Sequence, residues 1–223
     1  MEPYTVKVKE VEKITHDVLR IVTEKPSNFS FTPGQATEVA INKSNWQNEK
    51  RPFTFTSLPT DPHLEFTIKT YPSHNGVTNE LLNLKAGDEL IVGDAWGTIS
   101  YKGEGVFIAG GAGVTPFISI LRDLNSKDEL GSNRLIFANK KKADIIHDEE
   151  FKKILKDHFF NILSDEDIAH YSSGYISEEF LKDLGVDNAK YIYLCGPRPM
   201  MKAVESQLNS LGVDKKAIVK EEF

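Results

Sequence analysis

The second half of the chain alternates short, largely apolar runs with amphipathic segments, and this alternation limits the folds open to it. The apolar runs are residues 106–109, 135–138, 159–163 and 191–194. Strands that are apolar on both faces belong in a parallel sheet covered by helices. We therefore predict a doubly wound α/β domain of the nucleotide-binding type over residues 101–223.

The segments between these runs carry helical periodicity and helix-end signals. In the first, apolar side chains recur on one helical face, at Phe117, Ile120, Leu121 and Leu124. Similar stripes follow in residues 151–155, 180–184 and 201–211. Thr115 is expected to cap the first helix with Pro116 at its first helical position, Ser177 to cap the third, and Gly212 to end the last.

The first hundred residues are typical of strands separated by turns. Leu64, Phe66 and Ile68 alternate with polar residues 65, 67 and 69, as one buried sheet face requires. Turn residues gather at 32–34, 58–62 and 85–88, and residues 79–84 resemble a short helix. Many short strands at regular spacing favour an antiparallel β-barrel over residues 1–100. The predicted fold thus has two domains.

Composition narrows the functions open to the chain. It has 27 basic and 33 acidic residues, a net charge of −6 that disfavours nucleic acid as a partner. The single cysteine, Cys195, excludes an intramolecular disulfide and a cysteine-ligated zinc or iron–sulfur site. The six histidines have no metal-ligand spacing, so no metal is expected. No apolar run approaches the roughly 20 residues of a membrane span. With no signal-peptide core at the N-terminus, we expect a cytoplasmic protein without a membrane partner.

The strongest local signal is the sequence IAGGAGVTP at residues 108–116, directly after an apolar run. Gly110, Gly111 and Gly113 allow a sharp turn and the close approach of a ligand. A helix N-terminus behind such a loop suits a pyrophosphate. The alternative is a tight strand-to-helix turn without a ligand. The spacing matches neither the GxGxxG fingerprint nor a P-loop.

The sequence LCGPRPMM at residues 194–201 ends the last apolar run. Cys195 would lie at the carboxyl end of a parallel strand, where open α/β sheets bind ligands. Gly196 and Pro197 would then turn the chain into the last helix. A lone buried cysteine that serves packing alone is the alternative.

The sequence RPFTFTSLP at residues 51–59 alternates a cation, aromatic rings and hydroxyls. Arg51 is suited to bind a phosphate, Phe53 to cover a flat ring and Thr54 to hydrogen-bond a ring heteroatom. A strand with a solvated Arg51 explains the same residues.

Taken together, RPFT, GGAGVTP and YLCGPRPMM resemble, in this order, the motifs of the ferredoxin–NAD(P) reductase superfamily of flavoenzymes. PGQ at residues 33–35 and EEF at residues 221–223 also match, so the resemblance spans nearly the whole chain. It is similar to a small bacterial flavodoxin or ferredoxin reductase. The resemblance implies an FAD-binding barrel over residues 1–100 and an NAD(P)-binding α/β domain over residues 101–223.

The resemblance assigns the flavin site to the barrel. In the cofactor-binding motif Arg51-Pro52-Phe53-Thr54, Arg51 would hold the flavin phosphates, Phe53 would pack on the isoalloxazine, and Thr54 would hydrogen-bond its N5. The next strand would line the flavin through Ile68, Lys69 and Tyr71. The second phosphate motif would be Asn75, Gly76, Val77 and Thr78, in which Asn75 replaces the family's glycine. Phe53 replaces the family's tyrosine and so lacks its hydroxyl.

The same resemblance assigns the dinucleotide site to the α/β domain. Gly110, Gly111, Gly113, Thr115 and Pro116 would take the nicotinamide dinucleotide. The nicotinamide ring would lie beside Cys195, with Gly196 and Pro197 continuing the pocket. Glu221 and Phe223 resemble the C-terminal acidic and aromatic pair at the flavin edge. Glu221 would relay protons or support Cys195, and Phe223 would shield the flavin ring until nicotinamide displaces it.

The implied reaction is hydride transfer from NADH or NADPH to FAD, with Thr54, Cys195 and Glu221 as catalytic residues. After the third apolar run, the acidic side chains of the segment Ser164-Asp165-Glu166 favour NADH, whereas the lysines at 140–142 would attract a 2′-phosphate. Electrons would leave to a separate carrier, such as a ferredoxin, a flavodoxin or an oxygenase component, or to a small acceptor. A flavin-binding redox sensor without turnover is the alternative function.

Overall fold

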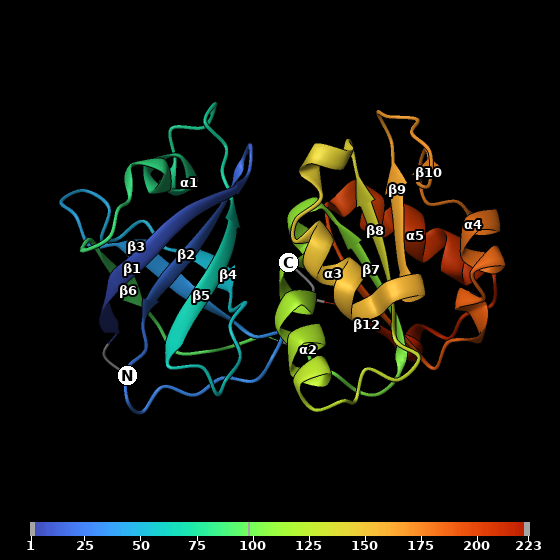
Figure 1. Cartoon of the computed structure of the whole chain (residues 1–223), viewed down its shortest axis with the longest axis horizontal. Helices are drawn as coiled ribbons and strands as arrows, with labels where there is room; N and C mark the ends of the chain where they lie inside the picture. Colours follow the sequence, from blue (N-terminus) through green and yellow to red (C-terminus); the bar gives the residue numbers. More distant parts are fainter. Residues whose placement is uncertain (1–2, 98, 221–223) are drawn as a thin grey trace. The chain divides into compact units, whose positions relative to one another are not determined.

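The computed structural model describes residues 3–97 and 99–220. They form two compact units (Figure 1), one of residues 1–100 and 115–123, the other of residues 101–114 and 124–223. Within the described residues, no helix has both the length and the apolarity needed to cross a membrane.

The first unit is a six-stranded antiparallel barrel, as the sequence predicts. Its strands are β1 (Tyr4–Thr15), β2 (Val18–Glu24), β3 (Ala36–Ile41), β4 (Arg51–Thr54), β5 (His63–Lys69) and β6 (Glu89–Val92), in the order β4-β3-β6-β1-β2-β5. The two edges meet where Phe55 pairs with Phe66. Next to this bridge the Thr56 N–H donates to the Glu65 carbonyl over 2.8 Å, which closes the barrel. The short helix is α1 (Val77–Glu80), continued by the 3-10 turn η1 (Leu81–Asn83).

Aromatic rings fill the barrel where its edges meet. Phe55 is fully buried; its ring stacks on Phe31 with centroids 4.4 Å apart and lies 5.4 Å from that of Phe66. Each such pair adds about 1 kcal/mol to the gain from burial. The rings therefore hold the β4 and β5 edges together.

The alternation along β5 predicts one buried face, and the structure buries both. Leu64, Phe66 and Ile68 are buried as expected, but Glu65 and Thr67 are only 4% and 5% exposed. The cause is a cover over the outer face of β5 that the local pattern does not reveal. It includes Arg122, which belongs to the first unit and bonds the Glu65 carboxylate.

The buried Glu65 carboxylate remains ionised because two guanidinium groups bind it. Arg122 Nη1 donates to Oε1 over 2.6 Å and Arg20 Nε donates to Oε2 over 2.7 Å, while the Thr56 hydroxyl donates to Oε1 over 2.9 Å. Burial by itself would raise the pKa of Glu65, but the charges and hydrogen bonds of Arg122 and Arg20 lower it to about 2.

The second unit is a parallel sheet with helices on both faces, again as predicted. Its strands are β7 (Gly105–Gly110), β8 (Arg134–Asn139), β9 (Phe159–Leu163), β10 (Ser172–Ser173), β11 (Tyr191–Cys195) and β12 (Ile218–Lys220). The order is β10-β9-β8-β7-β11-β12, with every pair parallel. The edge strands β10 and β12 escape the sequence pattern because they have only two and three residues.

The helices of the chain after residue 100 are α2 (Thr115–Ser126), α3 (Asp148–Leu155), α4 (Glu178–Asp183) and α5 (Arg198–Ser210). Short 3-10 turns are η2 (Gly111–Val114), η3 (Lys142–Asp144), η4 (Lys156–His158), η5 (Val186–Asn188) and η6 (Lys215–Ala217). Figure 1 shows α3 in front of the parallel sheet and α5 behind it. Accordingly, Phe151 of α3 packs edge-on against Phe137, whereas Leu181 of α4 and Val204 of α5 pack with Ile136.

The helix-end predictions have mixed outcomes. Ser177 caps α4, since its hydroxyl accepts from the Phe180 N–H over 3.1 Å. Thr115 is not a cap: the turn η2 runs directly into α2, so Val114 is the N-cap and Thr115 is already helical. Pro116 therefore occupies the second helical position, where its missing N–H is equally harmless.

The ionised Glu65 should make stability depend on pH. Its pKa is about 2 in the folded chain against an ordinary 4.5. The resulting stabilisation, about 3 kcal/mol, is therefore present above pH 4.5 and lost as the pH falls toward 2. We expect Glu65→Gln to lower the free energy of unfolding by about 3 kcal/mol at pH 7 and to weaken its acid dependence. Urea unfolding at pH 7 and pH 3 measures both.

Glu10→Gln is the matched control. Glu10 also pairs with Arg20, at 3.1 Å, but its side chain is 54% exposed. An exposed pair contributes about 0.5 kcal/mol. If Glu65→Gln shows the same acid dependence of stability as the unaltered protein, the loss of stability in acid does not come from Glu65.

Candidate functional site

The two glycine-containing loops of the second unit lie side by side at the carboxyl ends of neighbouring strands. β7 pairs with β8 on one side and with β11 on the other, so the chain order reverses between β7 and β11. Cys195, the last residue of β11, pairs with Ala109 of β7. Ligands of open α/β sheets bind at such a reversal point. The structure thus brings Gly110, Gly111 and Gly113 next to residues 195–197.

The glycines of the first loop have different roles. A Cβ on Gly113 would lie 2.4 Å from the Cys195 carbonyl oxygen, and one on Gly110 would meet the Met200 sulfur at 2.2 Å. A Cβ on Gly111 would have no neighbour within 4 Å. Gly110 and Gly113 thus make room for Met200 and the Cys195 backbone, a packing role in addition to the ligand approach that the sequence predicts, and that approach stays a prediction. Gly111 alone leaves the backbone open.

Helix α2 begins directly behind this loop and offers N–H groups and a positive dipole end. Its first residues, Thr115 and Pro116, belong to the first unit by their contacts. There the Thr115 hydroxyl lies 3.5 Å from the hydroxyl oxygen of Thr54, at the outer limit of a hydrogen bond. The structure therefore brings together two predicted site residues that are 61 positions apart in the chain.

Strand β4 presents the predicted flavin-binding residues at one edge of the first sheet. Arg51 and Pro52 are exposed, and Phe53 and Thr54 are partly buried. The Arg51 guanidinium lies 3.5 Å from Glu49 with its side chain 48% exposed, so it remains accessible to an anion. The Phe53 ring packs against the barrel core. An accessible guanidinium, an anchored ring and a hydroxyl on one short strand fit a phosphorylated, flat cofactor.

The predicted residues after β4 differ in accessibility. Ile68 as a whole is 2% exposed in the barrel core, so it has almost no surface open to a ligand. The Lys69 ammonium is bound to Asp17 at 2.7 Å. Tyr71 is 43% exposed and stacks on His74 with centroids 5.6 Å apart. Tyr71 is thus the residue of this group best placed to meet a flat ring.

The second phosphate motif lies at the start of α1. Gly76 is the N-cap, Val77 is buried, Thr78 is partly buried and Asn75 is exposed. A Cβ on Gly76 would have no neighbour within 4 Å, so the backbone is open there as it is at Gly111.

The acidic and basic runs that bear on nucleotide preference lie side by side after β8 and β9. The Asp165 N–H donates to the Lys140 carbonyl over 2.9 Å, and the Lys142 N–H donates to the Glu166 carboxylate over 2.7 Å. The lysines at 140–142 thus have acidic side chains close by. This proximity weakens the positive charge that they offer to a 2′-phosphate.

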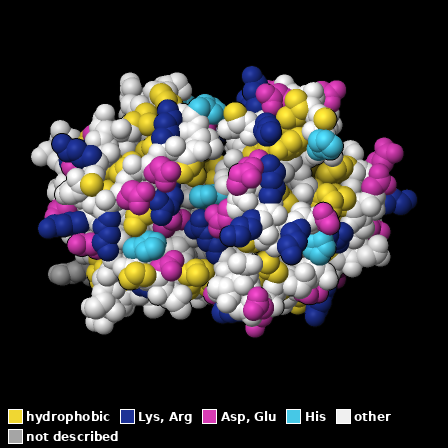
Figure 2. All heavy atoms as spheres, in the orientation of Figure 1, with side chains coloured by type: hydrophobic (Ala, Val, Ile, Leu, Met, Phe, Trp, Pro, Cys, Tyr) yellow, Lys and Arg dark blue, Asp and Glu magenta, His cyan; other side chains and the backbone are white. Residues whose placement is uncertain are grey.

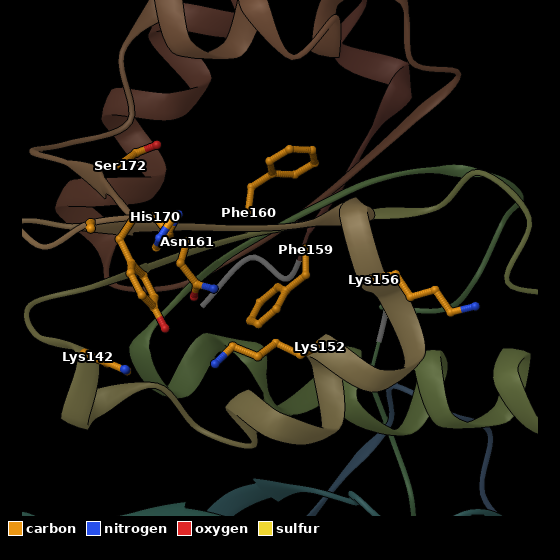
Figure 3. Close-up of a pocket in the computed structure, with 10 residues that line it drawn as sticks. Lys142, Lys152, Lys156, Phe159, Phe160, Asn161, His170 and Ser172 are labelled. Carbon is orange, nitrogen blue, oxygen red and sulfur yellow. The ribbon is translucent and has the colours of Figure 1, made fainter.

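A surface cleft of about 410 Å³ lies beside β9, on the side of α3 (Figure 3). Its lining combines cations with aromatic rings and an amide, from Lys142, Lys152, Lys156, Phe159, Phe160, Asn161, Ala169, His170, Tyr171 and Ser172. Lys152 is bound to Asp148 at 2.7 Å and to Glu149 at 3.0 Å. None of these lining residues belongs to the predicted site.

Sequence reasoning missed one exposed aromatic residue of the second unit. Tyr175 is 82% exposed and follows Gly174, which has φ +101°, just after β10. It offers a flat surface for a ring near the carboxyl end of the sheet. A glycine before an aromatic after a short strand is the signal that could have revealed it.

Two predicted residues, Glu221 and Phe223, lie outside the described residues. Within residues 3–97 and 99–220, no three or more His, Cys, Asp or Glu side chains are grouped so as to hold a metal ion.

Comparison with known proteins assigns a nucleotide to each half of the chain. Residues 3–92 match the model of an FAD-binding domain, and residues 107–206 match that of an oxidoreductase NAD-binding domain. The chain therefore belongs to the ferredoxin reductase-type oxidoreductases, which combine an FAD-binding and an NAD-binding domain.

The sequence is also similar to individual reductases. The chain is 28% identical to NADH-cytochrome b5 reductase 2 of Mycosarcoma maydis, over 92% of this chain and 65% of that protein. It is also 28% identical to the reductase component of propane 2-monooxygenase from Rhodococcus jostii, over 97% of this chain and 62% of the relative. The chain thus spans less than two thirds of the length of either.

Solved structures show the same fold. The FAD/NAD-binding domain of a nitric oxide dioxygenase from Vibrio cholerae has a TM-score of 0.88 at 22% identity, covering 100% of this chain and 99% of that one. A ferredoxin NADP⁺ reductase from Neisseria gonorrhoeae has a TM-score of 0.84 at 18% identity, covering 99% and 98%.

The contact between the two loops of the second unit can be tested with glycine variants. Gly113→Ala would push a methyl group onto the Cys195 backbone, so we expect a loss of about 3 kcal/mol in the free energy of unfolding. Gly111→Ala is the control, because its Cβ has open space although φ is +50°. That conformation costs about 1 kcal/mol. Chemical denaturation measures the free energy of unfolding of both variants. An equal loss in the two would show that Gly113 does not pack against the Cys195 backbone.

Proposed function

We propose that this chain is an FAD-dependent reductase that oxidises NADH and passes the electrons to a separate acceptor. The observation that carries the proposal is the pairing of an FAD-binding and an NAD-binding match in one chain. FAD supplies the chemistry, since it accepts a hydride and can release electrons one at a time. In this proposal residues 1–100 form the FAD-binding domain and residues 101–223 the NAD-binding domain.

Three residues of β4 would hold the flavin. The accessible Arg51 guanidinium would bind phosphate, and the ring of Phe53 would support the isoalloxazine. The Thr54 hydroxyl would donate to the flavin ring. The Thr54 hydroxyl oxygen lies 3.5 Å from that of Thr115, at the outer limit of a hydrogen bond, so this hydroxyl remains able to donate to a ligand. Tyr71 and residues 75–78 would complete the site on the same unit.

The loops after β7 and β11 would hold the dinucleotide. The open backbone at Gly111 and the N-terminus of α2 suit the pyrophosphate. Cys195, partly exposed at the reversal point of the sheet, would border the nicotinamide. We favour NADH over NADPH because Asp165 is exposed where a 2′-phosphate would need positive charge.

The acceptor is proposed to be a separate electron carrier or oxygenase component. The name of the Rhodococcus relative describes such a reductase component, and that of the Mycosarcoma relative describes reduction of cytochrome b5. On the face shown in Figure 2, basic and acidic side chains are intermixed on each unit. A docking site built from both charges would suit a partner with a mixed surface.

The first test is the absorbance spectrum of the purified protein mixed anaerobically with each nucleotide. We expect flavin bands that NADH bleaches faster than NADPH, because acidic groups repel the 2′-phosphate. Turnover with ferredoxin, flavodoxin, cytochrome b5 and ferricyanide then identifies the class of acceptor. A bound flavin that neither nucleotide reduces would favour a redox sensor. Failure to take up added FAD would overturn the proposal.

The assignment of Thr54 and Cys195 can be tested by stopped-flow reduction. We expect Thr54→Val to slow flavin reduction by about tenfold or more, since it removes a hydrogen-bond donor from the reacting ring. Thr54→Ser, which keeps the hydroxyl, should restore most of the rate. Cys195→Ala should slow reduction while leaving flavin affinity unchanged. Unaltered rates in both Thr54→Val and Cys195→Ala would show that these residues do not act in the reaction.

A further inference from the structure

Helix α2 has a polar face that is partly buried. Thr115, Ser119 and Arg122 recur at intervals of four and three residues, so they share one side of the helix. Ser119 is fully buried, and its hydroxyl accepts from the Gly34 N–H over 3.0 Å. Since these residues all belong to the first unit, the polar face attaches the start of α2 to the barrel.

Arg122 makes the strongest of these attachments. Its Nη1 donates both to the Glu65 carboxylate over 2.6 Å and to the Thr56 carbonyl over 2.7 Å. The carboxylate is 95% buried as a side chain, whereas Arg122 is 21% exposed. Charge-assisted hydrogen bonds of this length are about twice as strong as neutral ones. The contact therefore sets the position of α2 along the barrel.

The same short segment of the barrel meets both ends of this polar face. Thr56 contacts Arg122, and two residues earlier Thr54 contacts Thr115. The two threonine hydroxyl oxygens are 3.5 Å apart, which is already the outer limit of a hydrogen bond. Because a hydrogen bond weakens steeply beyond this distance, a small shift of α2 would end the contact.

We propose that Glu65 and Arg122 are positioning residues for the Thr54–Thr115 hydroxyl pair. They contact neither nucleotide in this proposal. They hold α2 where the Thr115 hydroxyl lies beside that of Thr54 and so orient the Thr54 side chain. The inference rests on the proposed function, in which Thr54 is the flavin's hydrogen-bond donor. It extends that function to the buried Glu65 carboxylate, which lies on β5 and not on the strand of Thr54.

Arg20 provides a matched control within the same network. It binds the other oxygen of Glu65 at 2.7 Å, from strand β2, and its side chain is 24% exposed. Arg122→Met and Arg20→Met each remove one guanidinium from the same carboxylate and keep an apolar stem. Both should therefore lower stability, but only Arg122→Met detaches α2.

The first measurement uses the flavin-free protein, so it does not depend on activity. We expect Arg122→Met to speed amide hydrogen exchange in residues 115–123 by about tenfold, because the helix loses its charged attachment. Arg20→Met should leave exchange in this segment within about twofold of the unaltered protein. Arg122→Lys keeps the charge and should fall between the two. This variant preserves the test if Arg122→Met does not fold.

The second measurement follows flavin reduction by NADH in the reconstituted proteins. We expect a loss of about tenfold in rate for Arg122→Met, with flavin affinity within about twofold, because a small misplacement affects the reaction more than binding. Arg20→Met should reduce at nearly the normal rate. Equal rate losses in the two variants, or no difference in exchange, would overturn the inference. If the unaltered protein is not reduced at all, the proposed function fails, and the exchange comparison still tests the attachment of α2.

Discussion

Glu65 stays ionised inside the barrel because two guanidinium groups replace the water that burial removes. Arg20 comes from β2, the neighbour of β5, whereas Arg122 comes from a helix 57 positions later in the chain. A buried carboxylate with a single partner would be strongly destabilising. The charge balance therefore makes α2 part of the barrel, and the position of the helix behind the glycine loop depends on it.

A second constraint acts in the parallel sheet. β7 and β11 are neighbours, and their loops approach so closely that Gly113 faces the Cys195 carbonyl. Close packing of two backbones requires glycine for steric reasons, independently of any ligand. One set of glycines thus serves protein packing while Gly111 leaves backbone exposed. The glycine-rich motif combines a structural and a binding role at successive residues.

The two constraints meet in α2. Its first turn follows directly from the loop that packs on Cys195, and its polar face is bonded to the barrel through Ser119 and Arg122. In the proposed reaction the loop serves the dinucleotide and the barrel serves the flavin. A single helix therefore follows the glycine loop in the chain and is bonded to the barrel through its polar face.

Local patterns were sufficient to predict much of this protein. Period-two alternation gave the barrel strands, wholly apolar runs gave β7, β8, β9 and β11, and the glycine loops marked the ends of two of them. These signals are reliable because they depend on the faces that each element buries. The ordered motifs also sufficed for the family, since each motif reflects a requirement of its own short segment.

Long-range contacts decided the rest. The alternation along β5 predicted one buried face and carries no information about a helix that covers the other face. Likewise, no local pattern shows that β11 would lie beside Gly110 and Gly113, so only the structure reveals their packing role. The sequence alone therefore determined which elements form and which family they build. Only the tertiary structure decided which polar groups are buried together, because burial depends on surfaces contributed by residues far apart in the chain.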